Sequence, residues 1–453
     1  NIIMNATKLT AQEQEQEKAK FSFSGATLYG INAVIGSGIF LLPQKIYKGL
    51  GPASLAVMLG TALLVILLAV CLAETAGYFN KNGGAFQYSK AAFGDFVGFN
   101  VGFLGWAVTI IAWSAMAAGF ARLFVITFKS FAPYELLLSV SLIILLSLMN
   151  ISGLKTSKMF TLTATVAKLI PIVAFSLCAI FFIKGGIDKG NFTPFLQLEP
   201  GVDIMKAISS TAIYIFYGFI GFETMSIVAG EMRNPEKNVP RAILGSISIV
   251  SVLYMLIIAG TIAMLGSRIL QTDASVQDAF VEMIGPAGAW IVSIGALISI
   301  AGLNIGESIM VPRYGAAIAD EGLLPKKIAE TNAKNAPVIA IIISGLLSIA
   351  LLFTGTFEVL AALSVVFRFF QYIPTALAVL VLRKKYPDKK VVFRVPFGPV
   401  IPILAVLVSL VMIWGENPMN YVYGLIGVLV ASAVYYIYIV LICKNKVLEQ
   451  KGE

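Results

Sequence analysis

The chain is a series of long apolar stretches separated by short polar segments. Most stretches reach the roughly 20 residues that an α-helix needs to cross the hydrocarbon core of a bilayer. Interior Gly and Pro, without strict alternation of polar and apolar positions, favour helices over barrel strands. The pattern predicts twelve membrane spans, at residues 24–47, 50–79, 95–128, 132–151, 158–184, 204–231, 239–266, 284–318, 337–355, 357–383, 397–415 and 419–443.

Composition supports an all-α integral membrane protein with no separate soluble domain. Of the 453 residues, 58% are hydrophobic and only 13% are charged, whereas soluble domains carry about 25% charged residues. The mean hydropathy is +0.88. Residues 1–20 are polar and lack the apolar core of a cleavable signal peptide, so we expect a short N-terminal tail there.

The distribution of positive charge predicts the orientation. Twelve spans place both termini on one side, and 23 of the 33 Lys and Arg residues fall on that side, against six on the other. By the positive-inside rule both termini are cytoplasmic in a cell membrane. The basic segment 384–396 is then a cytoplasmic loop, and topology explains the net charge of +9 without a nucleic-acid partner.

Several chemistries are excluded or disfavoured. The chain has no His, and its three Cys do not stand at metal-ligand spacing, so we expect neither a metal site nor a disulfide framework. No G-x-x-x-x-G-K-[ST] loop is present, so ATP does not power the protein directly. The absence of His and the scarcity of deep carboxylates also argue against an enzyme and against a bound cofactor.

Two glycine-rich interruptions stand at matched positions. The first span contains "VIGSGIF" (34–40), and the sixth, five spans later, contains "YGFIGFE" (217–223) with Gly218 and Gly221. Each Gly inside a helix costs about 1 kcal/mol relative to Ala. In a membrane, irregular backbone persists only where it lines a cavity or packs on protein. Broken helices at corresponding positions predict two inverted repeats of five helices.

Two interrupted helices can bind a zwitterion. The N-terminal end of an outgoing half-helix offers free N–H groups and a positive dipole to a carboxylate, and the last carbonyls of an incoming half-helix suit an ammonium. The alternative is that the glycines only permit close helix packing. The matched positions favour binding.

Four segments resemble the amino acid–polyamine–organocation permeases. They are "INAVIGSGIF" (31–40), "GGAFQYSKAAFG" (83–94), "GFETMSIVAGEMRNPEKNVPRAI" (221–243) and "PRYGAAIADEGLLP" (312–325). The resemblance covers residues from about 20 to 395 but identifies no substrate.

This resemblance implies a leucine-transporter-like fold with broken first and sixth helices. A ten-helix core would occupy residues 21–383, two additional helices would occupy 397–443, and residues 444–453 would form a C-terminal tail.

The resemblance also implies which residues bind substrate. Amides of the first break would take the carboxylate, carbonyls of both breaks would take the amine, and Phe216 or Tyr217 would be an aromatic gate. Trp113 is a candidate pocket wall, with core packing as the alternative. The implied substrate-binding residues are Val34, Ile35, Gly36, Ser37, Gly38, Trp113, Phe216, Tyr217, Gly218 and Ile220.

Lys168 is the second distinctive feature, within "TATVAKLIPIVAF" (163–175). A Lys at mid-membrane is costly and by default functional, although its head group could snorkel to the surface. The resemblance places it beside the first break, where sodium-coupled relatives hold sodium. It would act there as a built-in cation, with Ser299 as a partner, and argue against sodium dependence. Either a titrating Lys couples protons to transport, or a permanently charged Lys supports exchange.

Two further intramembrane charges allow two hypotheses. Glu307 and Arg368 could pair with each other, which we favour, or Arg368 could bind a substrate carboxylate through its guanidinium. Glu74, Glu223 and Glu231 are expected to form gate or packing pairs.

These observations predict a secondary active amino acid transporter that works by alternating access. Its substrate would be a neutral, small or medium amino acid, because few acidic groups are available to bind a cationic one. The alternatives are an acidic amino acid transporter that uses Arg368, and an amine or polyamine antiporter of the same superfamily with Glu307 as its acidic group.

Overall fold

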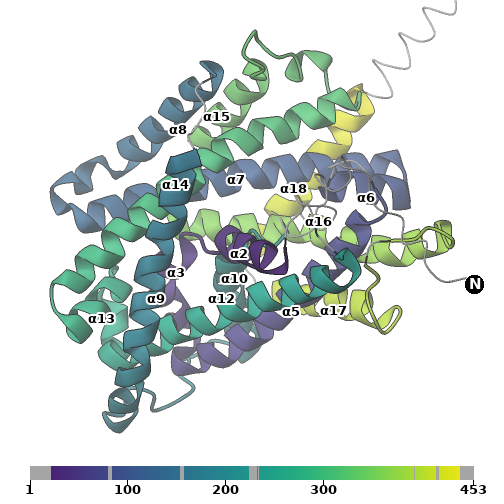
Figure 1. The fold of residues 1–453 in the computed structure, drawn as a ribbon. Coiled ribbons are helices and arrows are strands. Elements are labelled where there is room, and N and C mark those ends of the chain that lie inside the picture. The colour runs from purple at the N-terminus through teal and green to yellow at the C-terminus, as the bar shows by residue number, and fades with distance from the viewer. Residues whose placement is uncertain are drawn as a thin grey trace, which may run out of the picture.

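The computed structural model describes residues 22–79, 84–153, 158–223, 232, 234–391, 393–414 and 418–438. The tails at 1–20 and 444–453 and the carboxylate of Glu231 lie outside these ranges. Helices make up the bundle (Figure 1). In the first half they are α2 (Phe23–Val34), α3 (Gly38–Leu41), α4 (Pro43–Leu50), α5 (Ser54–Ala76), α6 (Gly84–Phe93), α7 (Asp95–Thr127), α8 (Glu135–Ile151), α9 (Lys158–Asp188) and α10 (Ile204–Phe219).

The second half continues the helical pattern. Its helices are α12 (Pro235–Leu265), α13 (Ser275–Ile284), α14 (Ala287–Asp320), α15 (Val338–Leu352), α16 (Phe357–Lys385), α17 (Val400–Trp414) and α18 (Pro418–Tyr435). Short 3-10 turns extend several of these helices, at Gly51–Ala53, Lys129–Tyr134, Gly266–Gln271 and Lys326–Ile328.

The helices agree with the predicted membrane spans. Within the described residues, eight helical stretches are long and apolar enough to cross a membrane, and α10, α15 and α17 are shorter apolar helices. Every predicted span coincides with helix over most of its described residues. The chain is therefore a multi-pass helical membrane protein.

Two short helices lie where the hydropathy pattern predicted only connections. α6 packs on α7 and α16, and α13 packs on α12 and α14. α6 buries Phe86 and Tyr88 while Lys90 stays near the surface. Helices of ten residues are too short to span a bilayer, so hydropathy alone does not find them.

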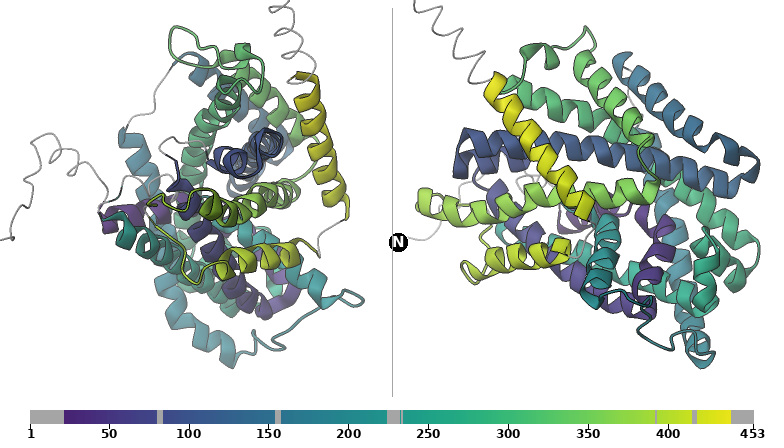
Figure 2. Two further views of the ribbon diagram at one scale, coloured as in Figure 1. Left: turned by 90° about the vertical axis from the view of Figure 1, so that its right-hand side faces the viewer. Right: turned by 180° about the vertical axis from the view of Figure 1, so that it is seen from behind.

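α2 and α10 are the first parts of the first and sixth predicted spans. α2 packs against α12, and α10 packs against α4, α5, α16 and α17. Both start at capped N-termini, since the Ser22 side chain accepts from the Gly25 N–H and the Asp203 side chain accepts from the Met205 and Lys206 N–H groups. Figure 2 shows α18 on the outside of the bundle, and of its residues only Gly424 and Ala431 are buried.

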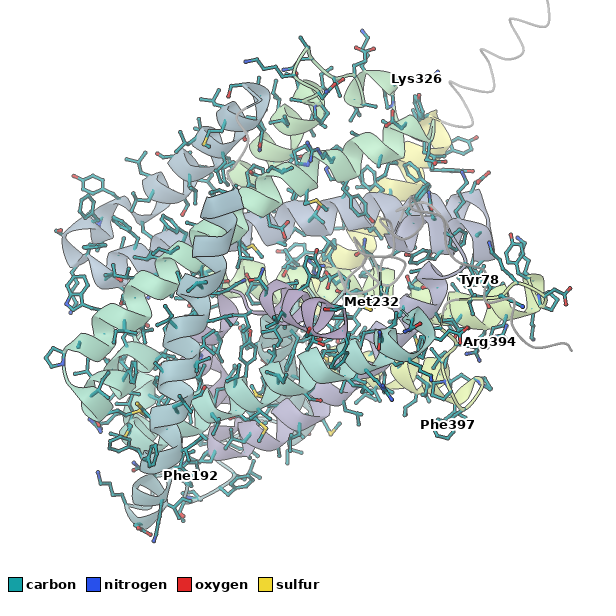
Figure 3. All side chains as sticks on the ribbon, viewed as in Figure 1. Tyr78, Phe192, Met232, Lys326, Arg394 and Phe397 are labelled. Carbon is teal, nitrogen blue, oxygen red and sulfur yellow. The ribbon has the colours of Figure 1, made fainter. Side chains whose placement is uncertain are left out.

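An ion pair ties α5 to the end of α16, as expected for Glu74. Arg383 donates from Nε and Nη2 to the two Glu74 oxygens, over 2.7 and 2.6 Å, and the Val395 N–H donates to the same carboxylate. Glu74 is fully buried. The Arg394 side chain lies beside Tyr78 at the same end of the molecule (Figure 3). The basic loop is thus anchored on α5.

Candidate functional site

The predicted break in the first span is present. α2 ends at Val34, Ile35 is extended with φ −69° and ψ 107°, and α3 begins at Gly38. The Ile35 N–H still bonds the Ile31 carbonyl over 3.1 Å, which closes the incoming half-helix. The Ser37 carbonyl accepts from the Phe40 and Leu41 N–H groups, and these are the first hydrogen bonds of the outgoing half-helix.

The sixth span is also interrupted at its glycines. α10 ends at Phe219, and Ile220 turns out of the helix with ψ 137°. Gly221 follows with φ +111°, a conformation that residues with a Cβ rarely adopt. Its N–H donates to the Glu223 carboxylate over 2.9 Å. Residues 224–231 lie outside the described part of the chain.

The two breaks pack directly on each other through glycine. A Cβ at Gly38 would lie 3.1 Å from the Gly218 Cα, and a Cβ at Gly221 would lie 2.2 Å from the Ala33 carbonyl oxygen. These contacts bring backbone against backbone, which is the reason glycine is required here. The structure therefore brings the predicted halves of the site together, from segments about 180 residues apart in the sequence.

The two neighbouring aromatic residues of α10, Phe216 and Tyr217, make different contacts. The Tyr217 hydroxyl lies 3.2 Å from the Ser37 Oγ, and its ring meets Phe357 edge-on. Phe216 instead packs in a cluster with Phe222, Phe369 and Tyr372. Of the two gate candidates, Tyr217 is therefore the one that contacts the first break.

Tyr254 of α12 joins the two breaks and was not singled out in the sequence. Its hydroxyl donates to the Gly218 carbonyl over 3.0 Å and lies 3.5 Å from the Val34 carbonyl. The side chain is 1% exposed. The only signal in the sequence is a Tyr within "SVLYMLIIAG" (251–260), which is equally typical of a core or interface residue.

We expect Tyr254→Phe to lower transport. Removing the hydroxyl leaves a buried carbonyl at one or both breaks without its donor, at about 1–3 kcal/mol, so kcat/KM for uptake should fall about 5- to 100-fold. Tyr47→Phe is the matched control, because Tyr47 is as deeply buried and its hydroxyl binds Gln197 on another part of the bundle. Equal effects of the two variants would contradict a role at the breaks.

Lys168 reaches the first break from α9. Its ammonium donates to the Asn32 carbonyl over 2.5 Å and to the Ile35 carbonyl over 3.1 Å, and the side chain is only 5% exposed. The head group therefore does not snorkel to the surface. The Ile35 carbonyl, expected to bind a substrate amine, already accepts from Lys168. Ser299 on α14 is buried but forms no hydrogen bond with Lys168.

Arg368 pairs with Glu223 rather than with Glu307, and this corrects the favoured pairing. Its Nη1 bonds the Glu223 carboxylate, which also holds the Gly221 N–H. Glu307 of α14 lies within electrostatic range of Arg368 and of Glu223, but it forms no ion pair within the described residues. The sequence pointed to Glu307 because it lies deep in a span, whereas Glu223 follows a helix break and its distance from α16 depends on the fold.

We expect charge removal at either partner to destabilise the protein. Glu223→Gln leaves the buried Arg368 guanidinium without its carboxylate partner, at about 3–5 kcal/mol. Arg368→Met should cost less, because the Glu223 side chain is 26% exposed and still accepts from the Gly221 N–H. The double variant should recover at least about 1 kcal/mol of the summed losses. Thermal unfolding of the purified protein in detergent measures the cycle. Additive losses would show that the two charges are not coupled.

Trp113 lies in α7 and is completely buried in the main core. Its indole N–H has no hydrogen-bond partner among the described residues.

These observations define a class of protein: an apolar, multi-pass helical bundle in which two interrupted helices pack on each other at their interruptions. The comparison with known families agrees, because the amino acid permease family matches residues 21–443. The chain therefore belongs to this family of membrane transporters.

Three relatives indicate what such proteins transport. The chain is 28% identical to a methylthioribose transporter of Bacillus subtilis over 95% of both chains. It is 27% identical to a serine/threonine exchanger of the same organism, over 83% of this chain and 86% of the relative. It is 26% identical to a branched-chain amino acid permease of that organism, over 91% of both chains.

Proposed function

We propose that the protein is a sodium-independent secondary amino acid transporter that moves a neutral, small or medium amino acid by alternating access. The observation that carries this proposal is the direct packing of two helix breaks, Gly38 on Gly218 and Gly221 on Ala33. The N–H and carbonyl groups that leave the helical hydrogen-bond pattern at two helix breaks can bind a carboxylate and an ammonium together.

The proposal includes the twelve-span, leucine-transporter-like architecture with both termini cytoplasmic in the cell membrane. The matched breaks support the inverted repeat, and the charge distribution supports the orientation. Alternating access would then move one repeat against the other around the junction.

Lys168 supports the absence of sodium coupling. Its ammonium donates to the Asn32 carbonyl of α2 and to the Ile35 carbonyl just after it, where the break leaves backbone oxygens without helical N–H donors. Proton symport and exchange both remain compatible with this contact, because either charge state of the amine can bind these carbonyls.

The relatives support a neutral substrate. One is named for serine and threonine and another for branched-chain amino acids. The methylthioribose relative favours a substrate that is neutral but is not an amino acid, because that sugar has neither a carboxylate nor an amine. The acidic-substrate alternative is weakened because Arg368 is engaged by Glu223, and the polyamine alternative rests on Glu307 alone.

Uptake by proteoliposomes tests the proposal. Labelled serine, leucine, glutamate, putrescine and methylthioribose are offered with sodium or choline outside, with or without a pH gradient, and with or without internal substrate. We expect uptake of a neutral amino acid that is equal in sodium and choline. Uptake only of methylthioribose or putrescine, or uptake that requires sodium, would overturn it. The pH-gradient and preloading arms separate symport from exchange.

A further inference from the structure

A polar cleft lies away from the helix breaks, between the end of α8, the second half of α14 and the start of α15. It has a volume of about 280 Å³. The three helices contact one another along this side of the bundle (Figure 1). The residues that matter for its chemistry are Asn150, Ser308, Ile309, Arg313, Lys334 and Asn335.

The cleft is positively charged. Two of its lining residues, Arg313 and Lys334, are cationic, and none of its described lining residues is acidic. The Lys334 ammonium donates to the Ser152 carbonyl over 2.7 Å, which positions it at the end of α8 and leaves two further N–H donors. Arg313 is exposed and offers a planar guanidinium that matches a phosphate.

The walls of the cleft are held in place by local hydrogen bonds. The Asn150 amide donates to the carbonyl and hydroxyl oxygens of Ser308, over 2.9 and 3.0 Å. The Asn332 side chain accepts from the Lys334 and Ala336 N–H groups and donates to the Ile151 carbonyl. The loop before α15 is therefore folded onto α8, so the cationic groups stand on a fixed frame.

The apolar surroundings identify the source of the phosphate. Within two turns of the cleft, Leu145 and Leu148 of α8 and Ile342 and Leu346 of α15 are exposed, each by 47–62%. A soluble phosphate would gain nothing from these side chains, whereas acyl chains below a headgroup would cover them. In the proposed orientation this end faces the cytoplasmic leaflet, where anionic lipids carry negative charge and bind basic clefts between helices.

We propose that this cleft binds the phosphate group of an anionic phospholipid of the cytoplasmic leaflet through Arg313 and Lys334. The site lies apart from the helix breaks, so it can fail without affecting the proposed transport function.

Lipid-dependent thermal unfolding of the purified full chain in a neutral detergent tests this site. Phosphatidylglycerol, phosphatidylcholine and glycerol 3-phosphate are added separately to wild type, to Arg313→Gln/Lys334→Gln and to Lys326→Gln/Lys327→Gln. The last variant removes the same charge from exposed positions of the same connection (Lys326 is labelled in Figure 3) but outside the cleft.

We expect phosphatidylglycerol at a hundredfold excess over its Kd to shift the unfolding equilibrium of wild type and of the control about a hundredfold, raising Tm by about 3 °C or more. The cleft variant should lose this shift. An equal shift in the cleft variant, an equal shift with phosphatidylcholine, or the same effect from glycerol 3-phosphate would overturn the proposal.

A second measurement covers the possibility that the cleft variant does not fold. The charge-preserving Arg313→Lys/Lys334→Arg variant and wild type are compared with the control by native mass spectrometry with phosphatidylglycerol. We expect all three to retain the same tightly held lipid and the single Arg313→Gln variant to retain one fewer. Equal retention by the single variant would overturn the proposal.

Discussion

Lys168→Ala is expected to reduce uptake at least about thirtyfold. Loss of the ammonium leaves the Asn32 and Ile35 carbonyls buried without a donor, at about 1–3 kcal/mol each, and each 1.4 kcal/mol is a factor of ten. The cost falls on the end of α2, next to the junction of the two breaks. Initial uptake rates in proteoliposomes with equal amounts of folded protein measure it.

The control for this prediction is Lys184→Ala, which removes an exposed Lys from the same helix. It should transport like wild type. Lys168→Arg keeps the charge and should retain more uptake than Lys168→Ala. A Lys168→Ala protein with more than about a tenth of the wild-type rate would contradict the role of the ammonium at the break.

Gly221→Ala is expected to abolish transport and to destabilise the fold. The new Cβ would lie 2.2 Å from the Ala33 carbonyl oxygen, and the backbone has φ +111°. Strain in such a conformation costs about 1–3 kcal/mol, and overpacking costs about 1–3 kcal/mol more. Because the clash is with backbone, the two breaks must separate to relieve it. Thermal unfolding and uptake measure the two effects.

Two other glycines serve as matched controls for Gly221. A Cβ at Gly306 of α14 meets nothing within 4 Å, and a Cβ at Gly36 has its nearest contact at 3.7 Å, on a Leu303 side chain. Gly306→Ala should leave stability unchanged or raise it by up to about 1 kcal/mol. Gly36→Ala should fold and unfold like wild type. Full activity of Gly221→Ala would show that the breaks do not pack as described.

Much of the fold could be predicted from the sequence. Hydropathy predicts the apolar helices because a bilayer imposes the length and polarity of each one. The interruption at Ile35–Ser37 is predicted because two glycines close together inside an apolar run are unfavourable for a continuous helix. The burial of Lys168 could also be expected, since apolar residues on both sides leave its head group no route to water.

The pairing of side chains could not be predicted. Glu307 was chosen as the partner of Arg368 because of its depth along its span, but depth says nothing about which helices are neighbours. The turn at Gly221 brings Glu223 next to α16, so Arg368 forms its ion pair with Glu223. Tyr254 gave no distinctive signal, because a Tyr in an apolar run is ordinary until its hydroxyl is located at two helix breaks.

The sequence by itself determined that the chain is a multi-pass helical membrane protein and where its two breaks lie, because these depend on local composition and on the thickness of the bilayer. Only the tertiary structure decided what each broken end contacts. Hydrogen bonds from Lys168 and Tyr254 cross between helices far apart in the chain. Such contacts depend on how the helices pack, and no local pattern of residues specifies that packing.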